Sequence, residues 1–190
     1  MESRRLRGDL GSVIARLLLL SCCALTALSS WGQLRVHMYP DDRLMWREMV
    51  AHVDNGLVRM GHSWSGDVAY TIHADAMWDE VRVFSGYSTS SLDIAFTLRE
   101  GQLYVGDSHF TDAILYTFSD GQIFVGDSTF PMDVAYTLRE EPRGLGQTGD
   151  TPLWGVYKED SRAWSDRLAV LEGPLDPASV FALLSATGWL

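Results

Sequence analysis

A unit of 20 residues that recurs along the chain constrains the fold more than any other feature. Three copies align without gaps, so that Val83, Leu103 and Ile123 are spaced 20 residues apart. These copies are Val83–Leu98 (VFSGYSTSSLDIAFTL), Leu103–Phe118 (LYVGDSHFTDAILYTF) and Ile123–Leu138 (IFVGDSTFPMDVAYTL). Looser copies occupy Leu57–Ile72 and Val156–Leu171, and a still weaker one occupies Val36–Val53. The repeat predicts one supersecondary element used five or six times, each copy covering its neighbour.

Each copy contains two short apolar runs, of which Ile123–Val125 and Val134–Leu138 are examples. Both runs are rich in β-branched and aromatic residues, which favour strands. In the second run bulky Tyr136 and Leu138 alternate with small Ala135 and Thr137, as expected for a strand with one face toward a core. The two runs therefore predict two strands per unit.

Two kinds of connection separate these strands. Glu100-Gly101 and Asp120-Gly121 lie between successive units and suit a tight hairpin whose central residues have positive φ. The connection within a unit, such as 126–133, is longer and rich in Gly, Asp, Ser and Pro, which is typical of a turn held by side-chain hydrogen bonds. Successive strands should pair antiparallel as a meander.

The number of strands bears on whether this sheet closes. Five or six units give 10–12 strands, and an open sheet of that size would leave two edges free to aggregate. We therefore expect an all-β domain over residues 33–173, curled or closed in a barrel-like, trefoil-like or propeller-like arrangement. An elongated stack, in which each unit touches only its neighbours, is the alternative.

The tail 174–190 has a different pattern. Asp176 followed by Pro177 is a typical helix start, and Gly188 a typical helix end. Between them Val180, Phe181, Leu183 and Leu184 form an apolar stripe at helical spacing. We expect a short amphipathic helix that covers an edge or an open end of the sheet.

The first 32 residues resemble a secretory signal peptide. Basic residues precede a short apolar core, and Ser30 and Gly32 provide the small residues of a cleavage site after Gly32. A retained membrane anchor and lipidation at Cys22 are the alternatives. The only two cysteines, Cys22 and Cys23, lie in this leader, so the mature chain would have no disulfide and no thiolate site.

Charge and motifs exclude several function classes. The chain has 15 basic and 25 acidic residues, and the part after Gly32 has 11 and 23, a net charge of −12. A protein that follows nucleic-acid phosphates needs the opposite sign. The sequence contains no nucleophile elbow, phosphate-binding loop or dinucleotide fingerprint, so it predicts neither a cofactor nor catalysis.

The motif Gly106-Asp107-Ser108 followed by Ile114-Leu115-Tyr116-Thr117 carries a family resemblance. It resembles the repeat of a group of small, uncharacterised exported bacterial proteins with tandem I-Y-x-G-D-S … D-I-L-Y-T-I units and a short helical tail. The similarity covers about residues 57–190 and implies export and a repeat fold, with no catalytic residues to transfer. The sequence departs from the G-D-S step at His62, Tyr87 and Glu159.

Two sets of loop residues are candidate sites. Asp107, Asp127 and Asp160 recur at one turn, and such carboxylates could bind Ca²⁺, although Asp in turns more commonly accepts backbone hydrogen bonds. Large aromatic residues recur in the longer loops and could contact a sugar or a protein, with burial under the sheet as the alternative. These aromatic residues are Trp64, Phe110, Phe130 and Trp164.

These features together favour a non-catalytic binding or surface-interaction module in the periplasm, on the outer surface or in the medium. The partner is unknown, with a glycan or an envelope protein as the expected classes. No membrane span is expected after cleavage of the leader. A purely structural envelope protein and a hydrolase of envelope polysaccharide or peptide are the alternatives.

Overall fold

The computed structural model describes residues 35–40, 44–75, 79–143 and 150–190. The proposed signal peptide and its cleavage site lie outside the described residues. Within them no helix is long and apolar enough to cross a membrane.

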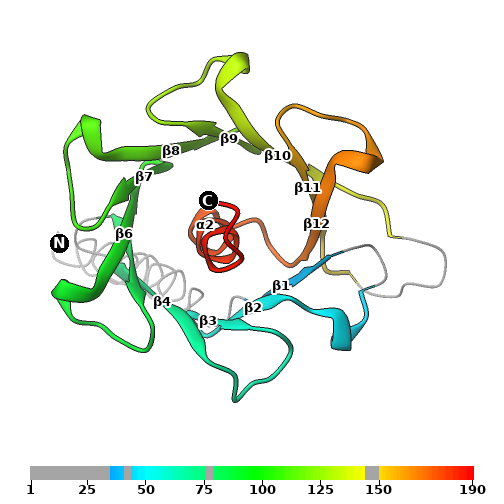
Figure 1. Ribbon diagram of the computed structural model, residues 1–190, viewed down its shortest axis with the longest axis horizontal. Coiled ribbons are helices and arrows are strands. Elements are labelled where there is room, and N and C mark those ends of the chain that lie inside the picture. Colours follow the sequence, from blue (N-terminus) through cyan, green and yellow to red (C-terminus); the bar gives the residue numbers. More distant parts are fainter. Residues whose placement is uncertain (1–34, 41–43, 76–78, 144–149) are drawn as a thin grey trace, which may run out of the picture.

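Twelve strands pair in chain order, and the first pairs with the last, so that the sheet closes into an antiparallel barrel (Figure 1). The closed barrel confirms the all-β prediction and excludes the elongated stack. The strands are β1 (Arg35–Tyr39), β2 (Ala51–Asp54), β3 (Leu57–Met60), β4 (Val68–Asp75), β5 (Glu80–Ser85), β6 (Ile94–Arg99), β7 (Gln102–Val105), β8 (Ile114–Ser119), β9 (Gln122–Val125), β10 (Val134–Glu140), β11 (Leu153–Lys158) and β12 (Arg167–Glu172).

Six units of two strands make up the barrel, and we number them 1 to 6 in chain order from β1–β2 to β11–β12. All six expected copies are present, including the weakest, Val36–Val53, which forms unit 1. Each unit sends a loop outward like a petal (Figure 1). Short 3₁₀ helices lie in five of these loops: η2 (Trp46–Glu48), η3 (Ser91–Asp93), η4 (Thr111–Ala113), η5 (Pro131–Asp133) and η6 (Trp164–Asp166).

The turns between units have the predicted geometry. Glu100 and Asp120 have φ of 49° and 50°, and the glycines that follow have φ of 80° and 76°. Within units 2 to 6 the strand register slips at one place, for example between Leu103 and Tyr104 in unit 4. Such a bulge adds twist and bends a strand, and here it lies at the base of each petal loop.

The core of the barrel is formed by side chains from the strands and from a helix inside the ring. Each first strand contributes at least one buried residue to the core, at one equivalent position: Met38, Val58, Val83, Leu103, Ile123 and Val156. The helix α2 (Pro177–Ala186) lies at the centre of the ring (Figure 1), where the Phe181 ring lies 6.4 Å from those of Tyr116 and Phe118. A closed sheet of about eight strands is filled by its own side chains, so twelve leave room for more.

This position of α2 differs from the expected one. Asp176 caps the helix by accepting a hydrogen bond from the Ser179 amide, and Pro177 follows it, as the sequence indicates. However, every residue from Ala178 to Leu184 is buried, so the helix has no solvent-exposed face over this stretch. The expectation of an amphipathic helix over an edge or an open end was wrong, because a closed barrel has no edge and its interior surrounds α2.

Candidate functional site

The petal loops are held in shape by their own side chains. In unit 5 the Ser128 hydroxyl donates to Asp133 (2.5 Å) and accepts from the Phe130 amide (3.1 Å). Ser88 with Asp93 and Ser161 with Asp166 make the same bond at 2.6 and 2.5 Å. Hydrogen bonds from Ser161 and Ser165 lower the pKa of the Asp166 carboxyl. The side chains at the loop tips therefore project from ordered turns.

The four predicted aromatic residues all lie on these loops and are exposed. Phe110 and Phe130 occupy equivalent positions just before η4 and η5 and are 75% and 71% exposed. Trp164 and Trp64 are 62% and 46% exposed, and each stands one position away from the equivalent of the two phenylalanines. The alternative that these rings are buried under the sheet is therefore wrong.

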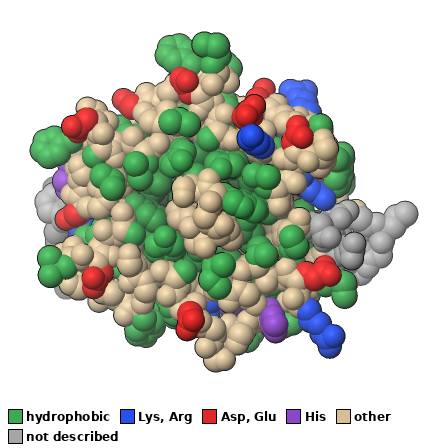
Figure 2. All heavy atoms as spheres, in the orientation of Figure 1, with side chains coloured by type: hydrophobic (Ala, Val, Ile, Leu, Met, Phe, Trp, Pro, Cys, Tyr) green, Lys and Arg blue, Asp and Glu red, His purple; other side chains and the backbone are tan. Residues whose placement is uncertain are grey.

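Further apolar side chains at the tips were missed by the sequence reasoning. Leu92 and Met132 occupy one equivalent position in η3 and η5 and are 92% and 95% exposed. The signal that could have revealed them is their shared place in the repeat. All six petal loops thus present at least one large apolar side chain, and Figure 2 shows such side chains around the outline of the molecule with Asp and Glu among them. We call this set the apolar rim: Trp46, Trp64, Tyr87, Leu92, Phe110, Phe130, Met132 and Trp164.

The three predicted calcium candidates are each bound to a different unit's side chain. Asp127 accepts a hydrogen bond from Gln102 Nε2 (2.5 Å), and Asp160 accepts one from Gln122 Nε2 (3.4 Å). Asp107 lies 3.4 Å from Arg82 Nε. In the described part of the chain no three His, Cys, Asp or Glu side chains are grouped so as to hold a metal. The repeat of these aspartates therefore reflects a contact between neighbouring units, which we call the junction tie.

Strand register shows that the junction tie is one position repeated. Arg82, Gln102 and Gln122 all pair across the strands with a threonine of their own unit: Thr97, Thr117 and Thr137. In unit 2 the residue paired in this way is Leu57, opposite Thr71. The residue of unit 3 that corresponds to Asp127, immediately after Gly86, is Tyr87. The junction of units 2 and 3 thus has Leu57 and Tyr87 in place of the tie.

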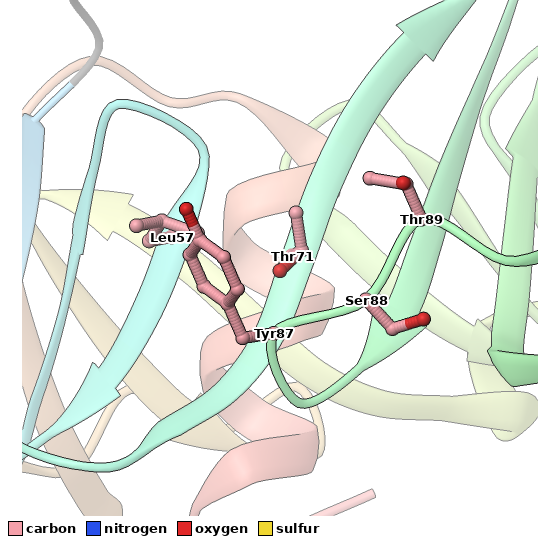
Figure 3. Close-up of a pocket in the computed structure, with 5 residues that line it drawn as sticks. All are labelled: Leu57, Thr71, Tyr87, Ser88 and Thr89. Atoms are coloured by element: carbon pink, nitrogen blue, oxygen red, sulfur yellow. The ribbon is translucent and has the colours of Figure 1, made fainter.

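A cavity of about 300 Å³ opens at this junction. Leu57 and Thr71 line it from unit 2, and Tyr87, Ser88 and Thr89 line it from the petal loop of unit 3. Figure 3 shows the Tyr87 ring extending from that loop toward Leu57, with Thr71 beside it. Tyr87 is 81% exposed, so most of its ring is open to solvent.

A second cavity, of about 590 Å³, lies beside an ion cluster between units 3 and 4. Glu80, whose side chain is 2% exposed, receives Arg82 on one carboxylate oxygen (2.5 Å) and Arg99 on the other (2.7 Å). Arg99 also contacts His109. Because a guanidinium group lies within ion-pair distance of each oxygen, this carboxylate has a structural pairing.

Units 1 and 2 replace the polar junction residues with histidine and tryptophan. His52 occupies the threonine position and its Nδ1 lies 2.8 Å from the Gly61 carbonyl oxygen, while Trp64 packs against the His52 ring at 4.8 Å. Burial lowers the pKa of His37 despite the nearby Glu172. The rings of Trp46 and Trp64 lie 5.7 Å apart and are the part of this cluster that reaches the surface.

Comparison with known proteins gives a family and no activity. The family model described as "6-fold beta flower protein" matches residues 38–148. No curated protein matches the sequence. An X-ray structure of an Arabidopsis thaliana protein is similar at 14% identity and a TM-score of 0.40, over 82% of this chain and 90% of that one. This likeness carries no argument about function.

Proposed function

The chain belongs to the 6-fold beta flower family. We propose that it is a non-catalytic binding module, because all six of its units contribute to the apolar rim. The observation that carries the proposal is the exposure of large side chains such as Leu92, Phe110, Phe130 and Met132. Single exposed apolar residues are common on protein surfaces, whereas a set repeated at loop tips marks an interaction surface.

The construction of the loops supports binding. Large apolar and aromatic anchors such as Phe130 and Trp164 supply most of the binding energy in protein interfaces. The Ser128–Asp133 and Ser161–Asp166 hydrogen bonds fix the backbone that carries them. The loops are therefore already ordered before a partner binds, so binding costs little of their conformational entropy.

The chemistry of the rim favours an envelope protein over a glycan as the partner. Leu92 and Met132 are aliphatic, and aliphatic tips fit apolar pockets on a protein surface better than the hydroxyl-covered faces of a polysaccharide. Loop carboxylates such as Asp93 and Asp133 stand close to them in the chain, and the whole chain has a net charge of −10. The partner should therefore have apolar pockets flanked by Lys or Arg, and salt should slow the association.

Export completes the proposal. The basic and then apolar leader supports secretion with cleavage after Gly32, as in the exported bacterial repeat proteins that the sequence resembles. N-terminal sequencing of the protein recovered from periplasm, outer membrane and medium tests this. An N-terminus at Gln33 is the expected result, and an intact leader on membrane-bound protein would identify a retained anchor.

The pairing at Glu80 supports a binding role over hydrolysis. Glu80 lies beside the larger cavity and its two oxygens are engaged by Arg82 and Arg99, so it is poorly placed to exchange protons with a substrate. A purely structural role predicts that tip residues such as Phe110 can be replaced without effect on any interaction.

The test is a double substitution at the two equivalent tips, Phe110→Ser with Phe130→Ser. Full-length protein carrying a photo-reactive group near the rim is cross-linked in cells, and the partner is then purified and its affinity measured directly. We expect the double variant to lose roughly tenfold or more in affinity. The control is Met60→Ser, which removes an exposed apolar side chain from strand β3. Equal affinity of both variants would refute the role of the rim, and rim-dependent binding to purified cell-wall glycan instead would replace the proposed partner.

A further inference from the structure

The geometry points to a binding site for one neutral sugar ring in the cavity between units 2 and 3. This site is separate from the partner surface proposed above, because it depends on the Leu57–Tyr87 junction and not on the other rim residues. The argument starts from the difference between this junction and its equivalents.

Three junctions have polar side chains that reach across them. Arg82 with Asp107, Gln102 with Asp127 and Gln122 with Asp160 each join a first strand to the next petal loop. At the junction of units 3 and 4 the charged cavity of about 590 Å³ lies beside the Arg82–Asp107 pair. The two Gln–Asp pairs therefore provide the internal references for a tied junction.

The junction of units 2 and 3 keeps the threonine hydrogen bond to the next unit and lacks the junction tie. The Thr71 hydroxyl donates to the Gly86 carbonyl oxygen at 2.8 Å, as Thr97 does to Gly106 and Thr117 to Gly126. The units are therefore held together in the same way as their neighbours. Leu57 and Tyr87 form no tie, and the cavity of about 300 Å³ lies between them.

The lining of this cavity combines an aromatic ring, an aliphatic side chain and hydroxyl groups. Within the described residues, the Tyr87 and Thr89 hydroxyls have no hydrogen-bond partner. The Ser88 hydroxyl donates to Asp93 and accepts from the Ser90 amide, so it keeps one lone pair for a ligand. Figure 3 shows Tyr87, Ser88 and Thr89 on one continuous loop, opposite Leu57 and Thr71.

These groups match the chemistry of a pyranose. A sugar ring presents C–H groups on its faces, which pack on an aromatic ring such as Tyr87, and hydroxyls on its rim, which exchange hydrogen bonds with Thr89 and Ser88. Among the described residues, no charged side chain lines the cavity, so a carboxylate or phosphate ligand would lose its hydration without a cationic partner there. A volume of about 300 Å³ is at the lower end of the range for ligand sites, which fits one ring and not an oligomer.

The probes are methyl β-glucoside, methyl α-mannoside and N-acetylglucosamine as neutral sugars, with glucuronate and inorganic phosphate as charged ones. Saturation-transfer NMR on the full-length protein detects weak binding of the sugars and of glucuronate, phosphorus NMR line widths detect binding of phosphate, and titration gives the affinity. We expect at least one neutral probe to bind, with saturation strongest on its ring C–H protons. Binding of the charged probes alone, or of no probe, would overturn the proposal.

The repeat itself supplies the variants. Leu57→Gln with Tyr87→Asp installs the junction tie of units 4 and 5 at the open junction, and we expect roughly tenfold or greater loss of affinity for the neutral probe. The converse pair, Gln102→Leu with Asp127→Tyr, should open an equivalent cavity and give a second binding site. Tyr87→Ala serves if the double variants do not fold.

Two further measurements keep the outcomes distinct. The Phe110→Ser, Phe130→Ser variant keeps Leu57 and Tyr87, so it should bind the neutral probe as the parent does. If it does while losing its protein partner, the two sites are separate. Undiminished probe binding by the closed variant and by Tyr87→Ala would refute the assignment of the site to this junction.

Discussion

The hydroxyl of Thr117 donates a 2.8 Å hydrogen bond to the carbonyl oxygen of Gly126 in the following unit. Thr71, Thr97 and Thr137 make the same bond across their own junctions, to Gly86, Gly106 and Glu159. In unit 1 His52 stands in this position and its ring nitrogen lies 2.8 Å from the Gly61 carbonyl oxygen. Neighbouring units are therefore joined by a side-chain contact to a carbonyl oxygen of the next unit, in addition to strand pairing.

We expect Thr117→Val to lower the free energy of unfolding by about 1–2 kcal/mol, because the substitution keeps the shape of the side chain and leaves the part-buried Gly126 carbonyl without its donor. Urea unfolding followed by circular dichroism measures the change. Thr117→Ser, which keeps the hydroxyl, should lose less than Thr117→Val. The opposite order would show that the methyl group and not the hydrogen bond stabilises the junction.

Gly101, in a hairpin turn between units, and Gly126, at the start of a petal loop, provide a matched pair of glycines. Both have positive φ, 80° and 65°, so alanine costs about 1–2 kcal/mol at either position. A Cβ at Gly101 would lie 2.7 Å from the Phe118 carbonyl oxygen, whereas one at Gly126 would meet nothing within 4 Å. Gly101→Ala should therefore destabilise the protein more than Gly126→Ala in urea unfolding. Equal losses would mean that the backbone conformation alone determines the cost.

Local features of the sequence predicted most of the fold. The alternation around Tyr136 and the Asp120-Gly121 turn depend on residues within a few positions, so strands and hairpins follow directly from the pattern. The position of α2 depends on closure of the barrel, which joins β1 to β12 across the whole repeat region. Closure removes the edges, so a helix expected at an edge or an open end becomes the filling of the interior.

The candidate site was only half visible in the sequence. Tyr87 stood out as a departure from the G-D-S step, but its counterpart Leu57 lies 30 positions earlier in a different unit. The two are recognised as a replaced tie only when strand register aligns Leu57 with Gln102. Asp127 was a calcium candidate for the same reason, because its true partner lies 25 residues away.

Tyr157 makes the free energy of unfolding depend on pH in the alkaline range. Burial, followed by its hydrogen bond to Glu141, raises the pKa of Tyr157 to about 12. The folded state therefore holds its proton more tightly than the unfolded state, whose tyrosine pKa is about 10. This contribution is complete below pH 10 and is lost as the pH rises toward 12. Tyr39 acts in the same direction, with its pKa raised to about 12 by burial and Glu172.

The measurement is the free energy of unfolding from pH 8 to 12. It should fall above pH 10 in the parent protein, and more shallowly in Tyr157→Phe, which has no phenol to titrate at this position. Phe110→Ala, which changes an exposed side chain that carries no proton to titrate, should leave the slope unchanged. A slope that is the same in all three proteins would assign the alkaline loss to other groups.

Phe181 on α2 tests whether the interior helix is required for the barrel. Its ring is fully buried and lies close to Tyr116 and Phe118 on β8. Phe181→Ala should lower the free energy of unfolding by about 3–5 kcal/mol, because it removes buried apolar surface and leaves a cavity between helix and strands. Phe110→Ala makes the same chemical change at an exposed loop tip and should alter stability by about 0.5 kcal/mol or less. Urea unfolding compares the two. The diameter of a closed barrel is fixed by its strand number and tilt. The strands therefore cannot move inward to fill the cavity that Phe181→Ala leaves. A loss as small as that of Phe110→Ala would show that the stability of the barrel does not depend on the packing of the Phe181 ring between helix and strands.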